Sequence, residues 1–386
     1  MLKNKKWGQM IMIAVFVAAI CMQFVWWFLF GLYVDIQNVD DQEAVLNIEN
    51  RVMASKPVFS LFTYPKYFAN YEKYFNDNYK FRTPLISINS KMDYFIFNRS
   101  TNEDVILGED GWLFFRDTLA DYEKERLYTQ EELDEILINL LETQKYMDEK
   151  GIEFIVYVAP NKNTIYGEYM PQGVKVANEI SRTEQAIEYV RENSDITIIY
   201  PKEELMLAKE QYPNLQFYFK LDSHWNYMGG YFGVKPVMET LGIPMPSIEE
   251  MTYEAVNEPI FHWNGYDLAN MLGLTGYLNQ DTNYRLEGYS GEGVTYEGDA
   301  SVSLEAFEGS MRTYCEAGEP RKLYFARDSF GESMTPYLAK TFGEMYSISR
   351  YTVTKSSIEE EAPDVFLYEM SERYELAWIN VHSWPE

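Results

Sequence analysis

The chain has 386 residues, with 33 lysines and arginines against 60 aspartates and glutamates, which gives a formal net charge of −27 at pH 7. This charge argues against a nucleic-acid-binding protein, because binding to a phosphate backbone needs a basic surface. It leaves only a local basic cleft for any polyanionic ligand. Apolar residues make up 46% of the chain, which is ordinary for a globular protein and permits a sizeable core.

Residues 10–33 contain no charged side chain and can cross the roughly 30 Å apolar layer of a bilayer as one helix. Lysines precede this segment and aspartates follow it, so the positive-inside rule predicts a cytoplasmic N-terminus. A cleaved signal peptide is the alternative, but no small-residue cleavage site follows Tyr33. Ile20 before Cys21 is also too bulky for a lipoprotein signal. We therefore expect a single-pass cell-membrane anchor with the remainder of the chain outside the cytoplasm.

Three regions are expected from this organisation. Residues 1–34 form the cytoplasmic tip and the anchor. Residues 35–100 form a polar stalk and a helical lead-in, with helix-like stretches at 71–79 and 85–97. Residues 101–386 form one catalytic domain, with a loop-rich, acidic insertion near 243–320.

Helical and strand patterns alternate within this large domain. A turn and an apolar strand are predicted at 108–115, and a helix over 129–150 is closed by Gly151 as its C-cap. A buried strand follows at 152–158. Further helices are predicted at 177–192, 202–210, 227–241 and 332–342, and further strands at 196–200, 322–326, 345–352 and 365–368. This alternation predicts a three-layer α/β domain with a mainly parallel sheet, in which ligands bind at the carboxyl ends of strands.

Asp222 and His224 are expected at a strand-to-helix corner, between the segment 217–221 and a helix. An aspartate two residues before a histidine can accept from one ring nitrogen and leave the other nitrogen free to act as a base. Ordinary capping of the following helix by Asp222 or Asn226 is the alternative interpretation.

Ser329 lies in the sequence Asp328-Ser329-Phe330-Gly331, between a predicted strand and a predicted helix. Backbone N–H groups at such a turn can stabilise an oxyanion, with help from the helix dipole, and Gly331 permits tight geometry behind the serine. Helix capping is again the alternative. Because a serine nucleophile needs an oriented base, the two motifs together predict a Ser329–His224–Asp222 triad.

Other side chains near these motifs are candidates for substrate or oxyanion contacts. Asn161 can donate to an oxyanion and Lys162 can touch an anionic substrate, although a plain loop explains both equally well. Arg327 can bind substrate or pair with an acid. Trp225 and Phe330, which follow the histidine and the serine directly, are further candidates. The last candidates lie in one aromatic stretch that can either stack on sugars or pack in a loop: His262, Trp263, Asn264 and Tyr266.

Several other kinds of site are disfavoured. Cys21 and Cys315 are the only cysteines, so thiol chemistry outside the membrane would depend on Cys315, which we interpret as a small loop residue. Three histidines without a cysteine cluster make a zinc site unexpected, and His382 near the end is interpreted as incidental. The HExxH, GxxxxGK[ST] and GxGxxG signatures are absent, and we expect no metal and no cofactor.

In order along the chain, several short motifs resemble those of the AlgJ/AlgX-type SGNH-hydrolase-like proteins, also called DHHW proteins. The matching stretches are 108–115, 158–162 with Pro171, 222–226 (DSHWN) with Gly229 and Gly230, 267–272 (DLANML), 328–330 (DSF) and 363–374. The resemblance runs from about residue 60 to the end. Two positions depart from the family pattern, because Ser223 replaces a second histidine and Arg327 stands where GDS-type esterases have glycine.

The resemblance implies an SGNH-hydrolase-like fold and a catalytic role for Asp222, His224 and Ser329. It also implies O-acetylation of a bacterial exopolysaccharide beside a many-helix membrane acyltransferase that supplies the acetyl group. We therefore expect an O-acetyltransferase of a cell-surface or secreted polysaccharide, working through an acyl-enzyme. A carbohydrate O-acetylesterase with the same triad, or a non-catalytic polysaccharide-binding component of an export complex, are the alternatives. The polysaccharide, the acyl donor and the oligomeric state do not follow from the sequence.

Overall fold

The computed structural model describes residues 10, 12–18, 21, 54–59, 64–77, 82–260, 265–289, 291–297 and 310–386. The chain divides into two units, Met1–Val52 and Met53–Glu386. Most of the predicted anchor at 10–33 lies outside the described residues, and those of it that are described are helical. Among the described residues, no helix has the length and apolar character that crossing a membrane requires.

The second unit is organised around a seven-stranded sheet with the strand order β4-β3-β11-β9-β10-β8-β7. The five strands from β4 to β10 run parallel, while β8 and β7 are antiparallel additions at one edge. This confirms the predicted mainly parallel sheet. The strands are β3 (Glu153–Ala159), β4 (Thr197–Ile199), β7 (Thr295–Glu297), β8 (Ser310–Tyr314), β9 (Glu319–Arg327), β10 (Phe342–Ser349) and β11 (Val365–Ser371).

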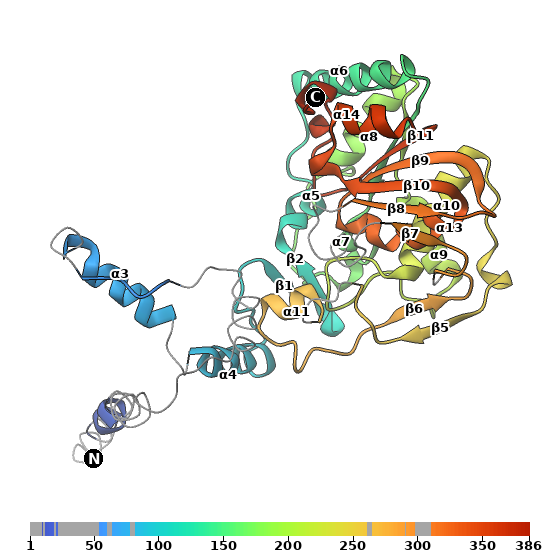
Figure 1. The fold of residues 1–386 in the computed structure, drawn as a ribbon. Coiled ribbons are helices and arrows are strands. Elements are labelled where there is room, and N and C mark those ends of the chain that lie inside the picture. The colour runs from blue at the N-terminus through green and yellow to red at the C-terminus, as the bar shows by residue number, and fades with distance from the viewer. Residues whose placement is uncertain are drawn as a thin grey trace. The chain divides into compact units, whose positions relative to one another are not determined.

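Helices cover both faces of this sheet and give the domain three layers (Figure 1). Strand β3 shows why, because Ile155 and Tyr157 point into one apolar core while Val156 and Val158 point into the other. The first core is closed by α7 (Lys162–Ile165), α9 (Lys202–Gln211), α10 (Tyr227–Leu241) and α13 (Thr335–Thr341). The second core is closed by α6 (Gln130–Asp148), α8 (Arg182–Asn193) and α14 (Lys355–Glu361).

Capping residues set the ends of helices on both faces of the sheet. Helix α6 begins after Thr129, whose side chain and that of Glu132 form a capping box. Its C-cap is Glu149 rather than the predicted Gly151, which follows two residues later with a φ of 71°. Helix α8 begins at Arg182 rather than at the predicted residue 177, because Ser181 forms a second capping box with Glu184. Helix α10 is capped by the Asn226 side chain, which accepts from the N–H of Gly229.

Three sequence-based expectations near the site differ from the structure. The helix predicted at 332–342 is divided into a five-residue 3₁₀ helix, Ser329–Ser333, and α13. The strand predicted at 345–352 is β10, which begins at Phe342 and ends at Ser349. The segment 217–221 is not a strand of the sheet: one β-bridge joins Tyr218 to Trp225 and leaves Asp222 and His224 in a tight loop. The expectation of a strand-to-helix corner there was therefore wrong.

Smaller elements of this unit lie outside the seven-stranded sheet. The hairpin of β1 (Val105–Leu107) and β2 (Leu113–Phe115) encloses the predicted turn at 108–112. Within the insertion expected near 243–320, β5 (Tyr253–Val256) pairs with β6 (Asn283–Leu286), and α11 (Asp267–Met271) contributes to a third apolar cluster with β1 and β2. The remaining helices are α3 (Tyr64–Asp77), α4 (Arg82–Phe95) and α5 (Leu119–Glu123).

Candidate active site

Ser329 is the first residue of the 3₁₀ helix that follows β9 directly. The turn is held by Asp328, whose carboxylate accepts from the N–H of Phe330 at 2.9 Å and from the N–H of Ser371 at 2.8 Å. The second of these bonds ties the serine turn to the end of β11. A Cβ on Gly331 would lie 2.6 Å from the Cβ of Arg327, so the turn needs glycine at this position.

His224 lies next to this turn and completes a chain of hydrogen bonds. Its Nε2 is 2.7 Å from Ser329 Oγ, and its Nδ1 is 2.6 Å from Asp222 Oδ1. An ionised Asp222 accepts only, so the network assigns the proton to Nδ1 and leaves Nε2 to accept from the serine hydroxyl. Asp222 and His224 are buried, while Ser329 is partly exposed. The structure thus brings together the three residues of the predicted triad.

A second carboxylate, that of Asp267 at the start of α11, also belongs to this site. Its Oδ2 lies 3.6 Å from His224 Nδ1, and it accepts from the hydroxyl of Ser223 at 2.5 Å and from the N–H of Ser223 at 2.7 Å. The N–H of Asp267 in turn donates to Asp222 Oδ2 at 2.8 Å. Asp267 begins the DLANML stretch but had no predicted role. No local sequence pattern indicates that it contacts a loop more than forty residues away.

The two carboxylates differ in their protonation behaviour. Burial alone would raise the pKa of Asp222, but the adjacent His224 and the N–H donors of His224 and Asp267 hold that pKa below its usual value. Burial and the neighbouring Asp222 charge raise the pKa of Asp267 to about 6. The carboxylate that faces the imidazole most closely is therefore the one that stays ionised.

Asp222, His224 and Asp267 also form the one group of potential metal ligands in the described part of the chain, with ligand atoms within 4.8 Å of one another. Their oxygen atoms already accept hydrogen bonds from the imidazole, from Ser223 and from backbone N–H groups. This arrangement orients an imidazole and has the chemistry of a base-activating network.

Lys162, predicted as a possible contact for an anionic substrate, instead holds the histidine loop. Its buried ammonium group donates to three carbonyl oxygens, those of Phe219 at 3.0 Å, Lys220 at 3.2 Å and Asp222 at 2.6 Å. Burial lowers its pKa to about 8. Because all three of its donors are used by this loop, Lys162 acts as a clamp on the loop backbone.

Asn161 is buried at the carboxyl end of β3. Its N–H donates to Glu372 Oε2 at 2.7 Å, while neither atom of its side-chain amide has a hydrogen-bond partner among the described residues. A buried amide without partners is unusual and is available to a ligand. Burial and the neighbouring Asp121 carboxyl raise the pKa of Glu372 to about 8, and Glu372 also accepts from Thr164 and Tyr200.

Four other candidate contacts turn out to be packing residues. Arg327 is buried and pairs with Glu332 at 2.6 Å, the alternative that the sequence left open. Trp225 is buried and donates to the carbonyl of Phe330 at 2.7 Å, and Phe330 is fully buried with its ring 5.0 Å from that of His224. Tyr266, for which the sequence left sugar stacking and packing open, is only 2% exposed and donates to Asn257. All four side chains are therefore buried among other residues of the protein.

Further candidates do not enter the site. His262, Trp263 and Asn264 lie outside the described residues. His382 is exposed and pairs with Glu142 at 3.1 Å. Cys315 is buried in the turn between β8 and β9, where its N–H donates to Gly343. These positions leave the chemistry to the network around Ser329.

The expected oxyanion donors also need revision. The N–H of Phe330 is occupied by Asp328, and the helix that begins at Ser329 is a five-residue 3₁₀ helix that supplies little dipole. Among the described residues, the N–H of Ser329 has no acceptor. The backbone donor available at the nucleophile is therefore that of Ser329 itself.

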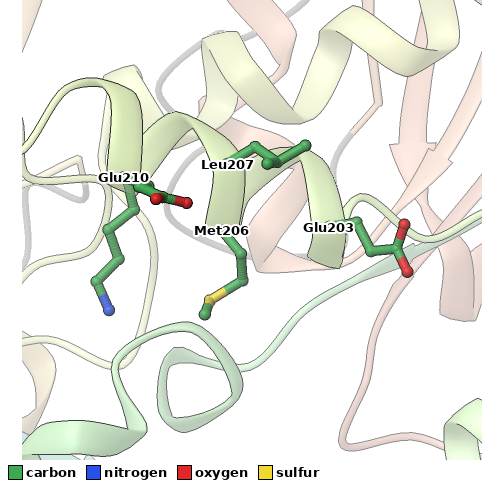
Figure 2. Close-up of a pocket in the computed structure, with 5 residues that line it drawn as sticks. Glu203, Met206, Leu207 and Glu210 are labelled. Atoms are coloured by element: carbon green, nitrogen blue, oxygen red, sulfur yellow. The ribbon is translucent and has the colours of Figure 1, made fainter.

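A pocket elsewhere on the surface shares no residue with this network. It lies along α9 and is lined by Glu203, Met206, Leu207, Lys209 and Glu210 (Figure 2). Figure 2 shows Met206 and Glu203 projecting from successive turns of the helix without a converging set of polar groups. The pocket lacks the oriented base and nucleophile found around Ser329, so we assign the candidate site to Ser329.

A family model of the SGNH hydrolase-like domain of the acetyltransferase AlgX matches residues 105–304. Among solved structures, Bacillus cereus PatB1 with a sulfonyl adduct has a TM-score of 0.52 and 15% identity, over 74% of this chain and 99% of that one. A DHHW family protein from Eubacterium siraeum has a TM-score of 0.47 and 15% identity, over 65% and 89% of the two chains. The O-acetyltransferase domain of Pseudomonas putida AlgJ has a TM-score of 0.44 and 16% identity, over 71% and 92%. The comparison with curated proteins gave no match.

Proposed function

Because the chain belongs to the AlgX family of SGNH hydrolase-like acetyltransferase domains, we propose that it transfers acetyl groups to hydroxyls of a cell-surface or secreted polysaccharide. The observation that carries this proposal is the hydrogen-bond chain from Ser329 Oγ through His224 to Asp222, at 2.7 and 2.6 Å. A serine hydroxyl is a weak nucleophile alone, and an oriented imidazole is the group that activates it.

In the first half-reaction, Ser329 Oγ attacks the carbonyl carbon of the acetyl donor while His224 Nε2 takes the hydroxyl proton. The bond between the acyl carbon and the donor's leaving group then breaks, and the imidazolium returns the proton to that leaving group. Asp222 holds the imidazole in the required tautomer and stabilises its charged form. The product is an acetyl ester on Ser329.

In the second half-reaction, a sugar hydroxyl attacks the acetyl-serine carbonyl and gives its proton to His224 Nε2. The ester bond to Ser329 Oγ breaks, and the serine oxygen recovers the proton from the imidazolium. The acetyl group is thereby moved to the glycan without a net change in protons. The N–H of Ser329 and the unpartnered Asn161 amide are the candidate donors to the oxyanion in both halves.

A carbohydrate O-acetylesterase is the second candidate, because water can resolve the same acyl-enzyme in place of the sugar. The half-buried position of the triad is compatible with either acceptor. A non-catalytic polysaccharide-binding role is disfavoured, since a protein with that role has no need to keep a histidine between a serine and a carboxylate at bonding distance.

The charge-free segment at 10–33 and the flanking charges support an extracytoplasmic domain on a single-pass anchor. A membrane-bound acyltransferase is the proposed source of the acetyl group. Tethering both proteins to one membrane raises their local concentration, which helps a short-lived transfer between them.

The test uses the full chain in detergent with 4-nitrophenyl acetate. We expect release of nitrophenolate that is lost in Ser329→Ala and His224→Ala and retained in Ser356→Ala, which changes a surface serine. Adding an oligosaccharide acceptor and finding acetylated sugar by mass spectrometry supports the transferase, whereas free acetate alone supports the esterase. Absence of turnover together with absence of labelling by a fluorophosphonate would reject both enzymes.

A further inference from the structure

Residues that follow two neighbouring strands border the serine turn on both sides. Strand β9, which leads to Ser329, lies between β10 and β11 in the sheet. Arg350 and Tyr351 come directly after β10, and Arg373 and Tyr374 come shortly after β11. Because the three strands are parallel, these four residues emerge at the same edge of the sheet as the nucleophile.

Three aromatic rings form a fixed surface around Arg350, which we call the aromatic platform: Tyr351, Tyr374 and Trp378. The guanidinium of Arg350 lies 4.2 Å from the ring centres of Tyr351 and Tyr374 and 5.7 Å from that of Trp378. Arg350 is only 4% exposed, and its Nε lies 3.9 Å from the Asp328 carboxylate, one residue before the nucleophile. The rings are therefore held in place next to the serine turn.

The outer rings of the platform are open to solvent. Tyr351 is 57% exposed and Trp378 is 49% exposed, although each packs against a buried or half-buried group on its inner side. Large aromatic side chains usually hide most of their surface. Two such exposed rings beside a candidate nucleophile provide a flat apolar surface for a ligand.

Arg373 supplies a charge beside the turn, on the segment that follows β11. Its guanidinium lies 5.1 Å from the ring centre of Phe330 and 5.4 Å from that of Phe115, and its Nε donates to Ser371 Oγ at 3.2 Å. Within the described residues no carboxylate pairs with it, in a chain with a net charge of −27. Its terminal N–H groups are thus available to oxygen atoms of a ligand.

We propose that the aromatic platform and Arg373 form the subsite for the glycan acceptor. This inference rests on the proposed function, and it identifies the residues that would hold the sugar. The apolar face of a pyranose ring would stack on Tyr351 and Trp378. Arg373 would donate to oxygen atoms of the same or the next sugar, and the hydroxyl to be acetylated would reach Ser329 between them.

This assignment replaces the sugar-facing surface that the sequence suggested around Tyr266, which is buried. A carbohydrate presents an apolar ring face and many oxygen atoms within a few ångströms, which matches the exposed rings and the arginine. Both a neutral sugar hydroxyl and a uronic acid carboxylate can accept from Arg373. The test therefore includes one glycan of each kind.

The experiment measures binding of cellopentaose, as a neutral glycan, and pentagalacturonic acid, as an acidic one, to the full chain carrying Ser329→Ala. Saturation-transfer NMR and titration calorimetry report the contact and the affinity. In this background Trp378→Ala, Tyr351→Ala and Arg373→Gln are compared with Tyr277→Ala, because Tyr277 is 56% exposed and lies outside the platform.

We expect at least one of the two glycans to bind, and each of the three subsite variants to weaken it about tenfold, the loss typical of one well-packed aromatic or arginine anchor. Tyr277→Ala should bind as the parent does. If Arg373→Gln weakens binding of the acidic glycan alone, the arginine binds a carboxylate of the sugar. If it weakens binding of both glycans equally, the arginine binds sugar hydroxyls. Binding of neither glycan, or equal affinity of all variants, would overturn the subsite.

The outcome is separable from that of the proposed function. In the chain that contains Ser329, turnover of 4-nitrophenyl acetate is measured separately, and Tyr277→Ala is the variant that should keep it, because Tyr277 lies outside the platform. If the unmodified chain does not turn over 4-nitrophenyl acetate, the proposed enzyme is rejected. If it does, but the subsite variants bind the glycans as tightly as the parent, only the subsite is rejected.

Discussion

The two loops that meet at the candidate site are positioned in different ways. The serine turn extends directly from β9, whose ladder with β10 and β11 fixes its place, and Asp328 adds one bond to the neighbouring strand end. The histidine loop has a single β-bridge and two backbone hydrogen bonds from other segments, those of the Leu113 and Ala269 N–H groups, and its other contacts come largely from side chains. Lys162 donates to three of its carbonyls, Asp281 accepts from the N–H of Leu221 at 2.7 Å, and Asp267 binds Ser223.

This difference suggests a division of roles. The nucleophile depends on the sheet, which forms the most regular part of the fold and is costly to distort. The position of the base depends strongly on buried side chains that bind the histidine loop. A single substitution can remove any one of these side-chain contacts. Changes around His224 should therefore affect catalysis more than stability, and changes around Ser329 should affect both.

Of the substitutions that test this division of roles, Asp222→Asn should have the largest effect on kcat. The amide can present an N–H to Nδ1 and favour the wrong tautomer, so we expect kcat to fall about 10³- to 10⁴-fold. Esterase kinetics with 4-nitrophenyl acetate measure the change. Asp328→Asn is the counterpart at the serine turn, where loss of one of two acceptors should lower the thermal midpoint with a smaller fall in kcat. If Asp328→Asn proved the more damaging to kcat, the division of roles would not hold.

Lys162→Met should come next, because it removes the ammonium donor from three carbonyls of the histidine loop, of which that of Lys220 still accepts from the N–H of Leu113. A displaced imidazole can cost about 10²-fold in kcat. The matched control is Lys209→Met: Lys209 also lies over an aromatic ring and donates to a carbonyl, that of Ile165, but holds no part of the triad. Thermal unfolding should show a loss of stability in both variants, whereas kcat should fall only in Lys162→Met. An equal fall in the two would mean that the clamp has no specific role.

Asp267→Asn should change the pH dependence of the reaction more than its maximum rate. Asp267 has a pKa of about 6, so the site gains a negative charge beside the His224 ring as the pH rises through that value, and Asp267→Asn removes this ionisation from the kcat/KM profile. Profiles between pH 4.5 and 8 measure this change, and Asp281→Asn is the control, since it holds the loop without lying next to the ring. Profiles of the same shape in Asp267→Asn and the parent would contradict the electrostatic role.

The smallest effect is expected for Glu372→Gln, which affects stability. The native state keeps a proton on Glu372 up to a pKa of about 8, whereas the unfolded chain releases it near 4.5. Because the native state then binds more protons, stability should fall as pH rises between these values. Thermal midpoints should therefore decline less with pH in Glu372→Gln than in the parent or in Glu359→Gln, a change at a surface glutamate. An unchanged slope would mean that this carboxyl does not titrate in that window.

The parts of this protein that could be predicted from sequence are those set by local patterns. Helix α6, strand β3 and the glycine after α6 follow from apolar periodicity and capping, and the mainly parallel sheet follows from their alternation. The pairing of Ser329 with His224 could also be predicted, because the chain has only three histidines and one of them follows an aspartate by two residues.

The rest depends on contacts between distant segments. Nothing in the sequence near Lys162 says that its ammonium group would be buried against a loop sixty residues away, and an exposed lysine beside a site is the more common arrangement. Asp267 enters the site through its backbone N–H as well as its carboxylate, which no residue-type pattern encodes. The antiparallel edge formed by β7 and β8 comes from a segment too polar to signal strands.

The central claim is that Ser329 carries the acetyl group. It is tested most directly by incubating the full chain with 4-nitrophenyl acetate, quenching with acid, and mapping acetylated peptides by mass spectrometry. We predict one acetyl group on the peptide that contains Ser329, absent in Ser329→Ala and strongly reduced in His224→Ala. Acetylation confined to other residues, or equal labelling of the His224→Ala chain at Ser329, would contradict the proposed mechanism.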